Sequence, residues 1–457
     1  MGVLDRMDKK HSWLCLENLI FAVIIGFMLP ISFSVSFTHS GILRVYPSML
    51  VYIILGIFLL IYLREKEIRK NKLVLNYLAL CMMYVFAFLY RYATGGDCVS
   101  SLYVFFWTIM PVSIFLLIYA GKLNYLKVSI NLYWSMTVTN IVSTIYHLFV
   151  LKALRSNFYE NVNNVVFYCI AGVFIYIFYY KNISKKFSFF YIFNVFYSFF
   201  VLIMSGSRLG FLCGILLAVY CVGLCIFSRE LRMPTGLALL LEAVICAIFL
   251  STNLYYCQSL VNRGIMIFGI SENMDKIAEI KENKGNKGSI ESKEEENKED
   301  KLSDDEIISA IEEQVKEGNT DAVMVYNDLG RIQMWENAID EIKKAPLIGT
   351  GKIAVFRTAD GGQLPHNFIL EYWLIYGGMG LILWIVLMIQ IIINTYKRTQ
   401  IRNFIAFLLF AAFSCAYSFA EPTLSNAFGP FLVWCGFGLY TSNNFSPVSN
   451  NSSSEDC

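Results

Sequence analysis

Residues 328–380 read DLGRIQMWENAIDEIKKAPLIGTGKIAVFRTADGGQLPHNFILEYWLIYGGMG, and this stretch leads from a soluble helix directly into a membrane helix. Asp328 can cap a helix that runs to about Lys344, and Pro346 stops it. The apolar residues of this helix recur at helical spacing, at Ile332, Trp335, Ala338, Ile339 and Ile342. A glycine-containing turn and Pro365-His366-Asn367 then precede a long apolar run. The stretch therefore predicts a surface helix, a turn and a spanning helix, in that order.

The composition of the whole chain is that of a membrane protein. Of its 457 residues 56% are hydrophobic and 16% are charged, with a mean hydropathy of +0.54. A soluble domain is closer to half apolar and about a quarter charged. The net charge of +2 favours no partner, because the distribution of charge along the chain matters more than its sum.

Runs of about 20 mostly apolar residues, the length needed to span a bilayer, occur throughout the chain. Twelve runs meet this requirement: 17–37, 45–63, 73–91, 101–120, 128–150, 163–180, 187–205, 209–227, 235–252, 367–395, 403–420 and 424–441. The sequence thus predicts an all-α polytopic bundle of about twelve transmembrane helices.

The Lys and Arg residues of the short loops predict the orientation, because cytoplasmic loops carry an excess of both. With the N-terminus inside, most of these residues fall on the inner side. We therefore expect cytoplasmic termini, an N-terminal bundle at 1–252, an extracytoplasmic loop at 253–366, C-terminal membrane helices at 367–441 and a polar tail at 442–457.

The large loop is expected to contain a disordered tether and short amphipathic helices. Residues 271–302 are mostly Glu, Lys, Asn, Ser and Gly, and cannot bury enough apolar surface to offset the entropy of ordering. Residues 303–317 start with Ser303 and three acidic residues, as helices do, and place Ile307, Ile308, Ile311 and Val315 on one face.

His366 is the candidate catalytic residue, because it is the one histidine flanked by Pro and Asn at the start of a spanning run. An unperturbed histidine titrates near pH 6.5, which suits a general base at neutral pH. The alternative is an interfacial histidine that only marks the end of a helix.

Two arginines are candidate anion ligands. Arg208 lies in the short outer turn 205–210, SGSRLG, where an arginine close to hydrocarbon tends to face a polar cavity or an anion. Its planar guanidinium suits phosphate oxygens. Arg331 lies in the first turn of the predicted surface helix, whose N-terminus also favours anions. Alternatively, Arg208 extends to lipid headgroups and Arg331 is a solvated surface residue.

Four further outer residues could support the site: Asn367, Glu371, Arg357 and Glu421. Glu371 lies one turn into the helix after His366, and Glu421 opens the last outer turn. Either carboxylate could orient a histidine or bind a sugar hydroxyl, or could simply be an interfacial polar residue.

Several common patterns are missing from the sequence. Gly349-Thr350-Gly351 imitates part of a dinucleotide fingerprint, but it follows a helix, and Lys352 is followed by Ile353 rather than by the Ser or Thr of a P-loop. No His/Cys cluster has metal-ligand spacing. We therefore expect neither cofactor nor metal.

Three segments together resemble the O-antigen ligase and Wzy-type polymerase family. They are the Ser-Gly-Ser-Arg turn at 205–210, the Arg-x-x-x-Trp and Pro-Leu-x-Gly-x-Gly pattern at 331–351, and the Pro-His-Asn through Gly-Gly-x-Gly segment at 365–380. Each motif is weak alone, and their order and shared outer location carry the resemblance.

The resemblance implies a glycosyl transfer at the outer face of the cytoplasmic membrane, from a polyprenyl diphosphate-linked glycan donor to a glycan acceptor. By the same resemblance Arg208 and Arg331 would hold the diphosphate and His366 would be the base. No nucleotide, metal or nucleic acid is implied. A chain-length regulator and a flippase are partners that the resemblance suggests.

Three functions remain open from the sequence. The first is polymerisation of lipid-linked repeat units into a capsule, an exopolysaccharide or O-antigen, and the second is ligation of finished glycan to another acceptor. The third is a lipid-linked glycan flippase, which predicts related halves and polar residues along the membrane midplane. The sequence shows neither of these flippase features.

Overall fold

The computed structural model describes most of the apolar runs and part of the large loop. The described residues are 18, 33–37, 41–45, 47–65, 71–93, 105–146, 162–185, 188–204, 208–252, 334–351, 356–358, 361–363, 365–420 and 428–442. The predicted tether at 271–302, the predicted helix at 303–317 and the C-terminal tail lie outside these ranges.

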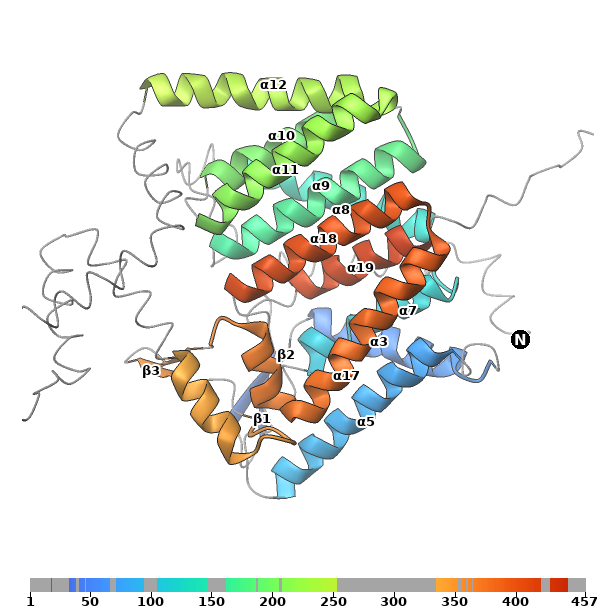
Figure 1. Cartoon of the computed structure of the whole chain (residues 1–457), viewed down its shortest axis with the longest axis vertical. Helices are drawn as coiled ribbons and strands as arrows, with labels where there is room; N and C mark the ends of the chain where they lie inside the picture. Colours follow the sequence, from blue (N-terminus) through green and yellow to red (C-terminus); the bar gives the residue numbers. More distant parts are fainter. Residues whose placement is uncertain are drawn as a thin grey trace, which may run out of the picture.

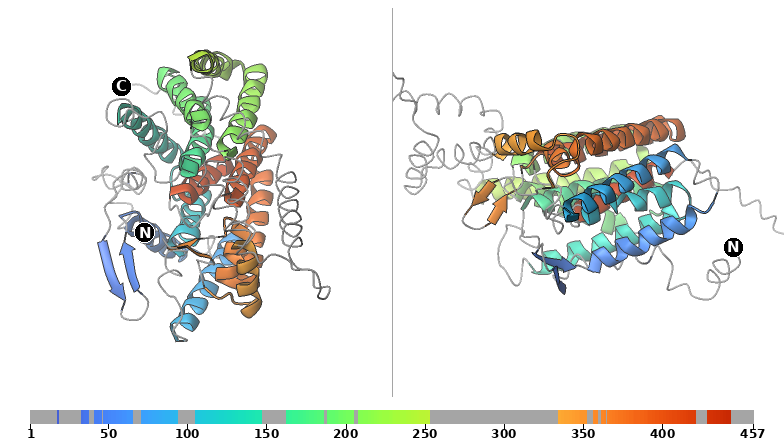
Figure 2. Two further views of the ribbon diagram at one scale, coloured as in Figure 1. Left: turned by 90° about the vertical axis from the view of Figure 1, so that its left-hand side faces the viewer. Right: turned by 90° about the horizontal axis from the view of Figure 1, so that it is seen from below.

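The described part of the chain is all-α in class, with long helices packed side by side (Figures 1 and 2). The elements before the large loop are α3 (Pro47–Tyr62), α5 (Lys72–Ala93), the π-helix η2 (Phe105–Ile109), α7 (Val112–Tyr119), α8 (Tyr125–Tyr146), α9 (Val162–Asn182), α10 (Ser188–Met204), α11 (Arg208–Phe227) and α12 (Arg229–Thr252). After the loop come α17 (Phe368–Arg398), α18 (Ile401–Ala420) and α19 (Phe428–Ser442).

Five of the described helices are long and apolar enough to cross a membrane: Lys72–Ala93, Gly210–Phe227, Arg229–Ile248, Phe368–Arg398 and Ile401–Ser418. The prediction of a continuous helix over 17–37 is wrong at its end, because Phe33–Phe37 forms strand β1, paired antiparallel with β2 (Gly41–Val45). Phe, Val and Ser alternate in β1, a period of two that fits a strand. The total of twelve spans stays a prediction.

Helix α9 is the centre of the bundle. Every residue from Val166 to Tyr180 is buried. A helix that is apolar on every side must be enclosed by other helices, and α9 packs against α8, α10, α11, α18 and α19. The rings of Tyr133 and Tyr179 stack with their centroids 3.9 Å apart and join α8 to α9.

A polar network that the sequence did not reveal crosses the same core. The side-chain amide of Asn140 donates to the Tyr176 hydroxyl at 2.9 Å and to the Asn194 carbonyl oxygen at 3.0 Å, and Asn194 donates to Thr137 at 2.7 Å. All four side chains are buried. Such mutually satisfied groups fix the relative positions of α8, α9 and α10. The interpretation that the membrane midplane lacks polar residues stays a prediction; within the described residues these polar side chains lie inside the helical core.

One end of the bundle collects basic residues, and we call it the basic end. Lys122 pairs with Glu65 at 2.7 Å, Lys185 pairs with Glu230 at 2.9 Å, and Arg398 lies over the Tyr119 ring, 3.9 Å from its centroid. These contacts join the end of α3 to the loop before α8, the loop before α10 to the first turn of α12, and the end of α17 to the end of α7. Loops that the charge pattern assigns to one side of the membrane thus share one end of the bundle.

The predicted orientation can be tested by cysteine labelling. In a background lacking Cys15, Cys98, Cys257 and Cys457, we expect Ser289→Cys, in the large loop, to react with a charged, impermeant maleimide on intact cells. Ser184→Cys, at the basic end, should react only after permeabilisation, because basic loops face the cytoplasm. Labelling of Ser184→Cys on intact cells without labelling of Ser289→Cys would overturn the orientation.

Candidate active site at the start of helix α17

Helix α17 is broken at Gly377, which has φ 71° and ψ 178° within an otherwise helical segment. Positive φ is a conformation that glycine adopts without the steric cost of a Cβ. The break divides α17 into a short first half, residues 368–376, and a long second half, residues 378–398, at a clear angle to each other (Figure 1). The second half alone is about 31 Å long at 1.5 Å per residue, enough to cross the hydrocarbon core.

The turn at residues 346–351 binds the backbone groups that this break leaves without helical partners. The Gly378 amide donates to the Pro346 carbonyl at 2.8 Å, and the Thr350 and Gly351 amides donate to the Leu374 carbonyl at 2.8 and 3.1 Å. The Trp373 indole also donates to the Pro346 carbonyl, at 2.9 Å. Breaks in membrane helices are tolerated where neighbouring groups replace the lost hydrogen bonds, as they do here.

Three glycines make this approach possible. Gly349 and Gly351 have φ of 79° and 75°, which confirms the predicted turn. A Cβ on Gly349 would lie 2.6 Å from the Gly377 nitrogen. One on Gly377 would overlap the Leu347 carbonyl, and one on Gly351 would overlap the guanidinium of Arg91. The pair Gly349 and Gly351, which resembles part of a nucleotide motif in sequence, therefore acts in close packing against the Gly377 backbone and the Arg91 side chain.

We call the contact between the 346–351 turn and the break at Gly377 the joint. Arg91, from a distant part of the chain, also contacts it. It lies in the last turn of α5, is only 3% exposed, and its guanidinium donates to the Ile375 carbonyl. The next residue, Tyr376, bonds through its hydroxyl to Thr108 at 2.8 Å. The sequence around Arg91 carries no signal that a broken helix would need this residue.

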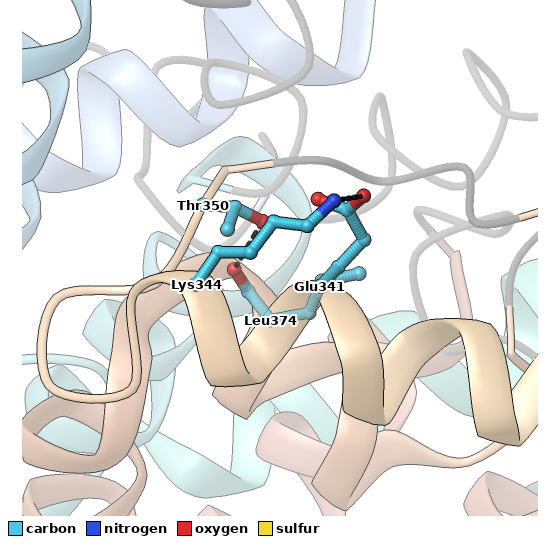
Figure 3. Close-up of polar contacts among 4 residues, drawn as sticks. All are labelled: Glu341, Lys344, Thr350 and Leu374. Atoms are coloured by element: carbon cyan, nitrogen blue, oxygen red, sulfur yellow. Dashed lines mark hydrogen bonds and ion pairs between the residues drawn. The ribbon is translucent and has the colours of Figure 1, made fainter.

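The surface helix before the turn is described over residues 334–344 and ends as predicted at Lys343 and Lys344. Lys344 pairs with Glu341 at 2.5 Å, next to the contact between Thr350 and the Leu374 carbonyl (Figure 3). Lys343 donates to Asp340, and this hydrogen bond lowers the pKa of the Asp340 carboxyl.

The buried face of this helix differs from the predicted one. Met334, Ala338 and Ile342 are buried, whereas Trp335 and Ile339 are 38% and 43% exposed. Trp335 serves as a hydrogen-bond donor instead: its indole nitrogen reaches the Pro365 carbonyl at 2.6 Å. The helix therefore holds the residue immediately before His366.

His366 itself has φ 50°, a left-handed conformation that is uncommon for residues other than glycine and costs of the order of 1 kcal/mol or more. Asn367 caps α17, because its side-chain oxygen accepts from the amides of Ile369 at 3.0 Å and Leu370 at 3.4 Å. His366 is thus fixed between a carbonyl held by Trp335 and a capped helix start. Unusual backbone conformations persist where the surroundings impose them, and they cluster at functional sites.

Glu371 lies one turn further along, with its amide bonded to the Asn367 carbonyl at 2.9 Å. Its side chain is 0% exposed. A buried carboxylate in the first turn interacts favourably with the positive end of the helix dipole. Full burial suits a role in orienting neighbouring groups better than direct binding of a sugar hydroxyl from solvent.

The other candidate residues are placed only in part. Arg208 begins α11, and the far end of that helix, Phe227, lies at the basic end. Arg208 and His366 therefore begin helices at the same end of the bundle, opposite the basic end. Arg357 is the middle residue of strand β3 (Phe356–Thr358), which pairs with β4 (Gly361–Gln363). Arg331, Glu421 and the side chain of Arg208 lie outside the described residues, so the convergence of Arg208, Arg331 and His366 stays a prediction.

Comparison with known families adds an independent finding. Residues 193–385 match the family model described as O-Antigen ligase, a segment that covers less than half of the chain. It runs from α10 through the break in α17 and contains positions 208, 331 and 366. No curated protein matches the chain. The family match confirms the resemblance that the motifs indicate.

Substitution of Gly377 tests the joint. We expect Gly377→Ala to lower the free energy of unfolding by about 2–4 kcal/mol, because the new methyl group meets the Leu347 carbonyl at a positive φ. The matched control is Gly223→Ala in α11, where a Cβ meets nothing within 4 Å and better helix propensity should add about 0.5–1 kcal/mol. Denaturation of the detergent-solubilised protein measures both, and equal stabilities would contradict the packing described here.

Proposed function

We propose that this chain polymerises polyprenyl diphosphate-linked repeat units into a cell-surface polysaccharide. The proposal starts from the match of residues 193–385 to the O-antigen ligase family and from the assignment of the chain as a membrane glycosyltransferase of this kind. The observation that carries this proposal is the fixed, left-handed His366 at the capped start of α17, inside the matched segment. A histidine held in this way suits proton transfer, because a general base must be positioned before its basicity matters.

In the proposed reaction His366 removes the proton from an acceptor hydroxyl, and the hydroxyl oxygen forms a bond to the anomeric carbon of the donor glycan. The bond from that carbon to the diphosphate oxygen breaks, and its electron pair stays with the diphosphate. Attack opposite the leaving group inverts the anomeric configuration. The protein supplies the base and the cations, so that the step as written uses no metal or nucleotide.

Arg208 and Arg331 are the proposed diphosphate ligands. The leaving diphosphate gains negative charge as the glycosidic bond breaks, so positioned guanidinium groups stabilise the transition state more than the ground state. Arg208 begins α11 at the same end of the bundle as His366. Asn367 and Glu371 are proposed to hold the segment around His366, and Arg357 and Glu421 are proposed as further polar residues of the site.

Ligation of finished glycan to another acceptor uses the same chemistry and remains the alternative, because fold does not determine the acceptor. The family is that of a glycosyltransferase, which speaks against the flippase. We propose polymerisation because no sequence feature demands a separate acceptor such as a lipid or a protein. A chain-length regulator and a flippase are proposed partners on the family resemblance alone.

Substitution of His366 separates chemistry from structure. His366→Gly removes the imidazole and also the steric cost of φ 50°, so we expect this variant to be no less stable than the wild type. If the imidazole is the base, polymer formation should nevertheless fall by about 10²–10⁴-fold. Single repeat units should then accumulate on the lipid carrier, as judged by glycan gels and lipid extraction.

The exposed Lys343→Ala, on the surface helix, is the control for His366→Gly and should leave chain length unchanged. Normal chain lengths in His366→Gly would show that the histidine is not the base. If His366→Gly still makes lipid-linked polymer of normal length but no longer transfers it to a second acceptor, the result would favour ligation over polymerisation.

The arginine assignment makes a separate kinetic prediction. Arg208→Ala and Arg331→Ala should each lower kcat by about 10²–10³-fold, as expected when a donor to a developing negative charge is lost. Arg331→Lys should restore only part of the rate, since lysine keeps the charge and loses the planar fork. Steady-state assays with purified lipid-linked donor measure this effect. A rise in KM with unchanged kcat would mean that these residues bind donor without stabilising the transition state.

A further inference from the structure

A cavity of about 360 Å³ opens at the basic end, between α9, α11, α12, α18 and α19, at the opposite end of the bundle from His366. Its walls are mostly apolar and aromatic and include Phe178, Tyr220, Gly223, Phe227, Ile405 and Tyr440. Phe227 is 78% exposed and Ile405 is 49% exposed. The cavity is therefore bordered by side chains on the outer surface of the bundle, where the acyl chains of a bilayer would lie.

Two basic residues line the cavity, Lys181 in the last turn of α9 and Arg402 in the first turn of α18. They are near enough for their charges to repel each other. Within the described ranges neither residue forms an ion pair, and the nearby Glu230 is paired with Lys185 at 2.9 Å. The pocket thus carries an excess of positive charge that an anion would neutralise.

The first turns of α12 and α18 begin beside this pocket: Ser228 precedes α12, and Arg402 and Asn403 are the second and third residues of α18. Helix N-termini add partial positive charge. An apolar wall next to two cations matches an amphiphile whose anionic headgroup and acyl chain are adjacent. A free anion would leave the apolar wall uncovered.

We propose that this pocket binds an anionic phospholipid of the surrounding leaflet, with its phosphate between Lys181 and Arg402 and the start of one acyl chain against Phe227 and Ile405. The lipid neutralises the two cations and covers the apolar wall. It also links the ends of α9, α11, α12 and α18, so that its binding stabilises the folded bundle. The site is separate from the proposed glycosyl transfer in both position and ligand.

Titration of the full-length protein with phosphatidylglycerol in a neutral detergent, followed by native mass spectrometry, tests this site. We expect K181Q/R402Q to bind phosphatidylglycerol roughly thirtyfold more weakly than the wild type, from about 1 kcal/mol for each basic residue near an anionic lipid. The control K127Q/K397Q removes two exposed charges from the same end, outside the pocket, and should retain wild-type affinity.

A second variant tests the cavity itself rather than its charge. In Gly223→Leu the new side chain enters open space on the pocket wall, keeps both cations and improves helix propensity. We expect a stable protein with at least tenfold weaker phosphatidylglycerol binding, since occupied volume excludes the ligand. Wild-type affinity in Gly223→Leu would show that the lipid does not enter the cavity. Equal losses of affinity in K181Q/R402Q and K127Q/K397Q would show that binding depends only on general surface charge. Either result would overturn the proposal.

The source of the phosphate is decided in the same assay. Phosphatidylcholine with identical acyl chains should bind at least tenfold more weakly, because its headgroup has no net charge. Glycerol phosphate at the same concentration should not compete with phosphatidylglycerol. Equal binding of phosphatidylcholine, or full competition by glycerol phosphate, would contradict an anionic-lipid site.

Discussion

The docking of the 346–351 turn onto the break at Gly377 is the constraint on which the end of the bundle near His366 depends. A spanning helix that loses hydrogen bonds near a bilayer must have them replaced, and here the replacements come from one short turn and from Arg91. Gly349, Gly351 and Gly377 are required together, because a side chain on any of them meets backbone or guanidinium atoms. The surface helix, the turn and α17 therefore form a single unit.

This unit explains how a residue in a surface loop can be held for chemistry. The surface helix is fixed at its C-terminal end by the turn, and Trp335 bonds it to the Pro365 carbonyl. His366 follows that carbonyl directly and precedes the cap at Asn367. Preorganisation of this kind is what proton transfer requires of a base. Our proposed mechanism uses the imidazole, and these contacts fix the backbone that carries it.

Hydropathy and charge were sufficient to predict most of the long helices in the described part of the chain and the grouping of the basic loops, because both follow from the cost of burying charge in hydrocarbon. The stop at Pro346 and the turn at Gly349 and Gly351 were also predictable from local conformational preferences. The role of Arg91 was not, because it depends on a carbonyl freed almost 300 residues away in sequence. The exposed face of Trp335 was mispredicted for a related reason: apolar spacing cannot show that an indole is needed as a donor. The network around Asn140 and Asn194 was missed because single amides in apolar runs do not reveal their partners.

The break in α17 also sets how far His366 lies from the lipid. In a straight helix the eleven residues from His366 to Gly377 would raise the imidazole about 16 Å above the level of Gly377. The bend instead turns the first half of α17 away from the axis of the second half, which shortens this rise. A diphosphate on a lipid carrier is held at headgroup height by its own anchor and cannot rise to meet a distant base. In the mechanism that we propose, the glycine break thereby brings the height of the base closer to that of a membrane-anchored substrate.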